Sequence, residues 1–107
     1  MDAASLLVKD GKIRHGLFFA HLAIEKAIKA IYTERLAKVP PKTHNLETLI
    51  KLAGISITQE HVEKIRLVNT FNIEGRYPDE GPPTPQAEEA AQYLNEAREI
   101  YAWLTRL

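Results

Sequence analysis

The sequence of 107 residues has no cysteine, which excludes disulfides, thiolate zinc sites and cysteine nucleophiles. It also lacks an excess of charge, because 14 basic side chains balance 14 acidic ones. A protein that binds nucleic acid or membrane with its whole surface needs net or clustered positive charge. The composition therefore argues against that class of function and leaves a local basic patch as the alternative.

Long hydrophobic runs are missing as well. No apolar run approaches the roughly 20 residues that span a bilayer, and the N-terminus lacks the basic-then-apolar pattern of a signal peptide. We therefore expect a cytoplasmic protein without membrane contact. Apolar residues still make up 45% of the chain, which is enough for one core, so we expect residues 1–107 to form a single domain.

The apolar residues that are present recur at helical spacing. The longest pattern runs from Lys12 to about Lys38 and has two adjoining apolar stripes, which indicate a central helix with more than one neighbour. The first stripe is Leu17, Ala20, Ile24, Ile28 and Ile31, and the second is Phe19, Ala23, Ala27 and Ala30. The expected polar side is Glu25, Lys26, Lys29 and Thr33. We expect Pro40 and Pro41 to end this helix.

Shorter helical patterns surround the long one. A short helix is expected within residues 1–10, a third near 46–53 capped by Thr43 or Asn45, and a fourth that begins after Thr58. Thr84 and Pro85 signal the start of a last helix that reaches about residue 106. No alternating strand pattern is present. The prediction is an all-α, up-and-down bundle of four or five helices.

Three segments occur in a fixed order: HLAIEKAIKA, then PPKTHNLETL, then RYPDE before the last helix. Together they resemble the HEPN domain family (higher eukaryotes and prokaryotes nucleotide-binding), from about Leu6 to Leu107. The resemblance implies a helical bundle that is commonly dimeric. In microbes such domains often lie beside a minimal nucleotidyltransferase, as its partner or within a toxin–antitoxin pair. Several branches of the family are RNA-cleaving toxins.

The RNases of this family use an arginine and a histidine with four to six residues between them. Arg76 lies in the corresponding region, but YPDEGPP follows it and no histidine lies at that distance. Arg14 and His21 have the spacing, but they lie too early in the chain. We therefore expect no catalytic residue, and we leave enzymatic activity undecided, leaning against it. No cofactor or metal is expected, because His21 and Glu25 alone are too few ligands for zinc.

Two polar clusters are candidate binding residues. Lys42 and His44 precede a helix N-terminus, where amide groups and the helix dipole favour a phosphate; alternatively, Thr43 caps the helix and His44 packs on the bundle. Arg76 and Tyr77 begin the second cluster, which also contains Asp79. An arginine holds a phosphate in two-point contact, and a tyrosine stacks on a base. The structural alternative is that Arg76 pairs with Glu25 or Asp79 and fixes the turn.

Glu25 and Lys29 share one helix side with His21, as part of a nucleotide pocket or as an ordinary ion pair. The predicted ligand-binding residues are Lys42, His44, Arg76, Tyr77, Asp79, Glu25 and Lys29. We expect Lys42 and Arg76 to bind phosphate, Tyr77 and His44 to contact base or sugar, and Glu25 and Asp79 to orient the cations.

The leading hypothesis for function is a non-catalytic HEPN-type domain that binds a nucleotide or RNA-related ligand, or partners a minimal nucleotidyltransferase. A metal-independent ribonuclease toxin and a purely structural adaptor dimer are the alternatives. A homodimer is expected through apolar residues of the first and last helices. The aromatic residues assigned to the core or to this dimer face are Phe18, Tyr93, Tyr101 and Trp103.

Overall fold

A computed structural model describes residues 4, 6, 9, 11–69 and 86–107 of the chain. This part of the chain forms four helices, α2 (Ile13–Leu36), α3 (Leu46–Leu52), α4 (Gln59–Asn69) and α5 (Ala87–Thr105), and contains no strand. The predicted all-α bundle is confirmed. Of the helix expected within residues 1–10, only Ala4, Leu6 and Lys9 are described, so most of that prediction lies outside the described residues.

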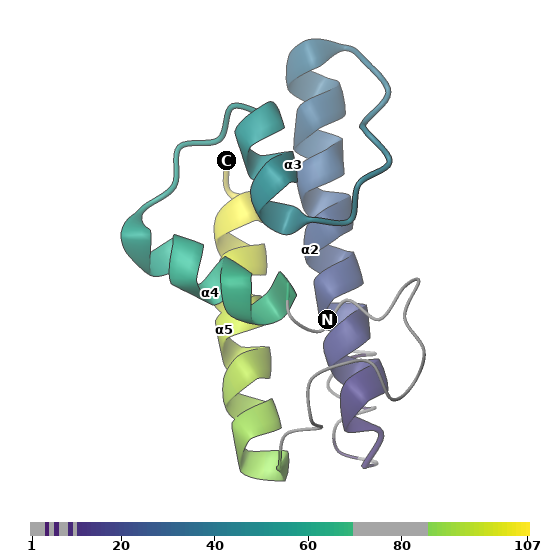
Figure 1. Cartoon of the computed structure of the whole chain (residues 1–107), viewed down its shortest axis with the longest axis vertical. Coiled ribbons are helices and arrows are strands. Elements are labelled where there is room, and N and C mark those ends of the chain that lie inside the picture. The colour runs from purple at the N-terminus through teal and green to yellow at the C-terminus, as the bar shows by residue number, and fades with distance from the viewer. Residues whose placement is uncertain (1–3, 5, 7–8, 10, 70–85) are drawn as a thin grey trace.

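The two long helices, α2 and α5, lie side by side and rise in the same direction, with α3 against α2 and α4 against α5 (Figure 1). Helix α4 crosses α5 obliquely (Figure 1), with the ring of His61 against Trp103 and Lys64 in contact with Glu99. The two long helices α2 and α5 are parallel. None of the described helices is long and apolar enough to cross a membrane.

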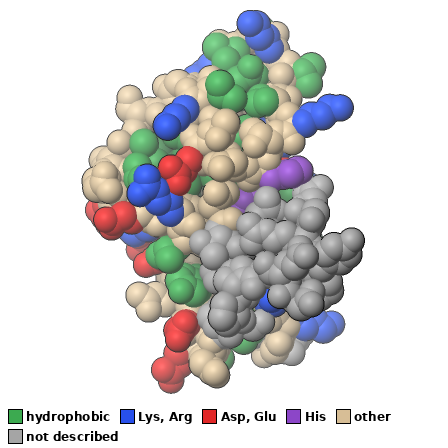
Figure 2. All heavy atoms as spheres, viewed as in Figure 1, with side chains coloured by type: hydrophobic (Ala, Val, Ile, Leu, Met, Phe, Trp, Pro, Cys, Tyr) green, Lys and Arg blue, Asp and Glu red, His purple; other side chains and the backbone are tan. Residues whose placement is uncertain are grey.

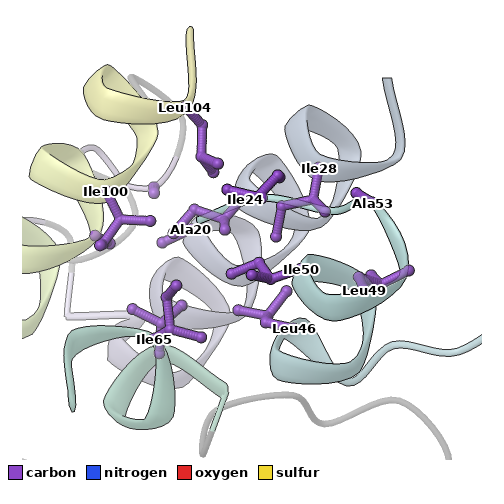
Figure 3. Close-up of a cluster of buried hydrophobic side chains, with 14 of the residues drawn as sticks. Ala20, Ile24, Ile28, Leu46, Leu49, Ile50, Ala53, Ile65, Ile100 and Leu104 are labelled. Atoms are coloured by element: carbon purple, nitrogen blue, oxygen red, sulfur yellow. The ribbon is translucent and has the colours of Figure 1, made fainter. Parts of the chain in front are cut away.

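One apolar core joins all four helices (Figure 3). The largest side chains that are less than 2% exposed include Ile24, Ile28, Leu46, Leu49, Ile65, Ile100 and Leu104. The first predicted stripe of α2 supplies this core as expected, apart from the half-buried Ile31. In α5 the sequence pattern favoured Tyr101, which is half-buried, and missed Ile100, which is fully buried.

The second predicted stripe of α2 is only partly covered. Ala23 and Ala27 are half-buried, whereas Ala30 and Phe19 are exposed, Phe19 by 42%. The alanines line an open groove whose other wall is formed by Tyr101 and Thr105 of α5. The predicted central helix with more than one neighbour is confirmed, since α2 contacts α3, α4 and α5, although its second stripe is only partly covered.

The prolines do not end α2. The helix stops at Leu36, four residues before Pro40, because Ala37 takes a left-handed conformation (φ 52°) and donates its N–H to the Thr33 carbonyl at 2.9 Å. A left-handed conformation costs an L-residue with a Cβ atom about 1–2 kcal/mol, so alanine gives no sequence signal for this cap. The expected helix end near Lys38 is thus slightly late.

The ends of the shorter helices follow local signals more closely. Asn45 caps α3 by accepting from the Thr48 N–H at 3.2 Å, and Gly54 follows the helix with φ +69°. Thr58 caps α4 by accepting from the His61 N–H at 3.3 Å, as predicted. The predicted start of α5 at Pro85 is two residues early, because the helix begins at Ala87 with Gln86 as its N-cap.

Candidate functional site

A buried carboxylate organises the polar side of α2. Glu25 is only 5% exposed, although it lies on the helix side that was expected to be polar. Its Oε2 accepts from Lys29 Nζ at 3.2 Å, one turn further along α2. Its Oε1 lies 3.0 Å from His44 Nδ1, which comes from the segment that leads into α3. We call these three residues the Glu25 cluster.

The cluster reaches the surface through its two donors. The side chains of Lys29 and His44 are 23% and 36% exposed, whereas that of Glu25 is 6% exposed. Because an ionised carboxylate only accepts hydrogen bonds, the His44 Nδ1 carries the proton in this contact. Glu25 therefore holds two donors in defined positions at the surface.

His21 lies one turn before Glu25 and is almost completely buried, with 1% of its surface exposed. Its Nε2 is 3.4 Å from Asn69 Oδ1, and the same oxygen accepts from the Leu46 N–H at 3.1 Å. A backbone N–H donates only to the oxygen of an amide side chain, so the Leu46 contact fixes the orientation of Asn69. The His21 Nε2 must then carry the proton of the neutral ring.

The other nitrogen of His21 faces Glu25 without a hydrogen bond. Its Nδ1 is 3.9 Å from Glu25 Oε1 and finds no hydrogen-bond partner among the described residues. Burial lowers the pKa of His21 below its usual 6.5, and this effect outweighs the contact with Asn69 and the charge of Glu25, which both raise it. His21 is therefore neutral at pH 7.

The amide groups at the start of α3 are largely occupied by the protein itself. Leu46 donates to Asn69 at 3.1 Å, Thr48 donates to Asn45 at 3.2 Å, and the Asn45 N–H donates to the Thr43 hydroxyl at 3.1 Å. These contacts take up the amides that we expected to attract a phosphate. The anion-binding part of that hypothesis now depends on the side chains of this segment.

Lys42 precedes this segment and is exposed, without an ion pair to any residue that the structure describes. The structure thus brings together Glu25, Lys29 and His44 and places Lys42 two residues from His44 along the chain. Three predicted binding residues, Arg76, Tyr77 and Asp79, lie outside the described residues, as does the suggested pairing of Arg76 with Glu25.

One member of the site, Asn69, was not found by sequence reasoning. His21 was placed on one helix side with Glu25 and Lys29, either as part of a nucleotide pocket or as part of an ordinary polar side. An asparagine near the end of a helix is common at exposed positions, so the sequence carries no signal that this one reaches α2 and α3. The helical spacing of His21, Glu25 and Lys29 was a correct signal for one shared side, but it did not show that the side is buried.

Charges of both signs lie on the surface. Figure 2 shows Lys and Arg side chains without Asp or Glu on the upper part of the visible face, whereas Asp and Glu side chains gather at its left and lower left. Among the described residues, no three His, Asp or Glu side chains are arranged to hold a metal ion. The chemistry available at the Glu25 cluster is therefore hydrogen bonding and local positive charge.

Comparison with known proteins gives one match. The family profile described as HEPN domain matches residues 1–107, the whole chain. Neither the curated proteins nor the solved structures contain a match. Functions in this family are related to nucleotides or RNA. Because the match covers the whole chain, this helical protein belongs to the HEPN domain family.

Proposed function

We propose that this HEPN domain binds a nucleotide or an RNA-related ligand, without chemistry of its own, at the surface formed by Lys42, His44 and Lys29. The observation that carries the proposal is the buried Glu25, which fixes two partly exposed donors by hydrogen bonds of 3.0 and 3.2 Å. Donors that are already held in place lose less conformational entropy when a ligand arrives.

The charges of this surface support an anionic ligand. Lys29 and Lys42 carry two positive charges against the single negative charge of Glu25, so the surface is positive before His44 is counted. Lysine binds phosphate groups as a point charge, whereas the Nδ1–H of His44 is already donated to Glu25, so this ring is left to contact base or sugar through Nε2. The proposed roles are phosphate contact for Lys42 and base or sugar contact for His44, with Arg76, Tyr77 and Asp79 as further proposed members.

Isothermal titration of the protein with AMP, ATP and a short single-stranded RNA tests the proposal. We expect Lys42→Ala and Arg76→Ala each to weaken binding about tenfold, which corresponds to about 1.4 kcal/mol. Lys38→Ala is the matched control, because Lys38 is an exposed lysine of the same connection. The proposal is wrong if none of these probes binds the domain, or if both variants bind as tightly as the control.

The finer expectations for this family are tested with the same material. A nucleotidyltransferase partner predicts a stable complex on co-expression with the product of a neighbouring nucleotidyltransferase gene. A ribonuclease predicts that pure protein cleaves RNA during the titration and that Arg14→Ala or Arg76→Ala abolishes cleavage. We propose the binding function over cleavage because no histidine follows Arg76 at the spacing that the family's RNases use.

We further propose that the domain forms a homodimer through the open groove between α2 and α5. Ala23, Ala27 and Ala30 give α2 a face on which a second helix packs closely. Lys26 and Glu34 line the same groove, each four residues from Ala30. Two antiparallel copies of α2 that cross at Ala30 would set Lys26 of each copy against Glu34 of the other, and this charge pattern fits a two-fold axis.

Light scattering after size exclusion tests the dimer. We expect a mass twice the monomer's 12.1 kDa, and a monomer for Ala30→Arg, whose long charged side chain would occupy the contact. Gln92→Arg is the control, because Gln92 is exposed and lies nine residues, or about two and a half turns, before Tyr101, on the opposite side of α5. A monomeric wild type, or a dimer that tolerates Ala30→Arg, would refute this interface.

A further inference from the structure

We propose that Asn69 is a positioning residue for the ligand site, because its side-chain oxygen fixes the segment that carries His44. This inference rests on the proposed function of the Glu25 cluster, since it concerns how one of the proposed binding residues is held there. Asn69 itself is not proposed to touch the ligand.

Asn69 is the last residue of α4 and joins three helices through one atom. Its Oδ1 accepts from the Leu46 N–H, the first amide of α3, at 3.1 Å, and lies 3.4 Å from Nε2 of His21 on α2. The three residues are far apart in the sequence, so this contact is formed only when the helices have assembled. Asn69 therefore ties the start of α3 to the side of α2 on which Glu25 lies.

The Leu46 amide has no alternative partner in water. Leu46 is fully buried, and the first amides of a helix have no acceptor within their own helix. If Asn69 lost its oxygen, this N–H and the Nε2–H of His21 would both lack an acceptor, and a buried donor without an acceptor destabilises the fold. The start of α3 would then shift to regain a partner.

A shift of Leu46 would reach His44 directly. Two residues of extended chain span only about 7 Å, so the position of Leu46 limits where the His44 ring lies. The contact between His44 Nδ1 and Glu25 Oε1 is 3.0 Å long, and a displacement of about 1 Å would break it. Asn69 thus acts on the ligand site through Leu46.

The second asparagine of this region does not serve the same purpose. Asn45 accepts from the N–H of Thr48, three residues further along, at 3.2 Å. This bond caps α3 but stays within the segment, so it leaves the position of the segment relative to α2 undefined. The two asparagines at one helix start therefore have separate roles, one local and one between helices.

Three variants of the full chain test the inference. Asn69→Leu keeps the approximate volume and removes the acceptor, Asn69→Asp keeps an acceptor oxygen, and Asn95→Leu is the control because Asn95 is exposed on α5. The readouts are hydrogen exchange of the Leu46 amide, the NMR signal of the His44 Nδ1–H, and the affinity for AMP. Circular dichroism verifies that each variant is folded.

We expect Asn69→Leu to accelerate exchange of the Leu46 amide at least tenfold, to alter the His44 Nδ1–H signal and to weaken AMP binding about tenfold. Asn69→Asp should retain all three properties at pH 7, and Asn95→Leu should not differ from wild type. A role limited to stability would lower the melting temperature while the folded protein kept its His44 signal and its affinity, and that result would overturn the inference.

Failure of the proposed function is recognised separately. If the wild type does not bind AMP, the exchange of Leu46 and the signal of His44 still report whether Asn69 positions the segment. If Asn69→Leu does not fold, Asn69→Ser replaces it, because a serine hydroxyl is too short to reach both partners. An unchanged His44 signal in the folded acceptor-free variant, or a loss in Asn69→Asp as large as in Asn69→Leu, would contradict the inference.

Discussion

The molecule contains two clusters built on the same spacing, a glutamate followed four residues later by a lysine. In the Glu25 cluster the pair is Glu25 and Lys29 on α2, joined at 3.2 Å. In the second, which we call the Lys64 cluster, Lys64 lies between Glu60 and Glu99 and contacts Glu60 at the same 3.2 Å. The glutamate side chain is 6% exposed in the first pair and 74% exposed in the second.

The difference shows that spacing alone does not define what an ion pair does. Hydrogen bonds to Glu99 and then to Glu60 raise the pKa of Lys64 above its usual 10.5, and the contact with Lys64 lowers the pKa of Glu99 below 4.5. Water surrounds both of these carboxylates and screens the interaction. Glu25 has lost most of its water, so it depends on the protein donors Lys29 and His44.

Removing the carboxylate from each cluster gives the largest expected contrast. We expect Glu25→Ala to lower the free energy of unfolding by about 1–3 kcal/mol, because two donors lose their acceptor and a buried side chain leaves a space. We expect Glu60→Ala, the control with the same i, i+4 spacing, to cost only about 0.3 kcal/mol. Urea denaturation of both variants at pH 7 measures the difference.

Equal effects of these two substitutions would break the comparison. They would mean that Lys29 and His44 exchange their hydrogen bonds with Glu25 for hydrogen bonds with water at no cost in free energy. The carboxylate would then not be needed to hold them. The ligand site would then lack its organising residue, and the AMP titration of Glu25→Ala would match that of the wild type. We expect instead that this variant binds more weakly even after correction for its unfolded fraction.

Most of the helical core could be predicted from sequence because it depends on periodicity. Ile24 and Ile28 repeat at four-residue spacing, and both are fully buried. Caps such as Asn45 and Thr58 are local as well, because each accepts from an amide three residues further along. The end of α2 could not be predicted, because Ala37 adopts its left-handed conformation without a glycine or asparagine signal.

The site was less predictable because its contacts join distant residues. Glu25 is separated from His44 by 19 positions, and Asn69 from Leu46 by 23. Helical spacing placed Glu25 and Lys29 on one side of α2, but only the assembled bundle covers that side and buries the carboxylate. The residues that could be named from the sequence were those whose side chains suggest contact with a ligand, whereas Asn69, which joins the helices, had no comparable signal.

A smaller effect is expected from His21, which lies beside Glu25. It makes stability depend on pH around the Glu25 cluster but not around the Lys64 cluster. The pKa of His21 in the folded protein is below its usual 6.5. At a pH between the folded pKa and 6.5, the unfolded chain therefore binds more protons than the folded chain. Its contribution to stability is complete above about pH 6.5 and is lost as pH falls through the folded pKa, with a slope of at most about 1.4 kcal/mol per pH unit. Both Lys64 and Glu99 keep their charges across this range, because their pKa values move away from it.

Urea denaturation between pH 5 and 8 tests this difference with His21→Gln, whose amide N–H still donates to Asn69 but does not titrate in this range. We expect the wild type to lose more stability than the variant on acidification. In the wild type, His21 is buried and takes up a proton on unfolding, whereas the glutamine of the variant takes up none. His15→Gln is the control, since it removes an exposed imidazole outside the site. If His21→Gln lost stability as steeply as the wild type and the control, burial of His21 would not be the source of the pH dependence, and the two clusters would differ in exposure alone.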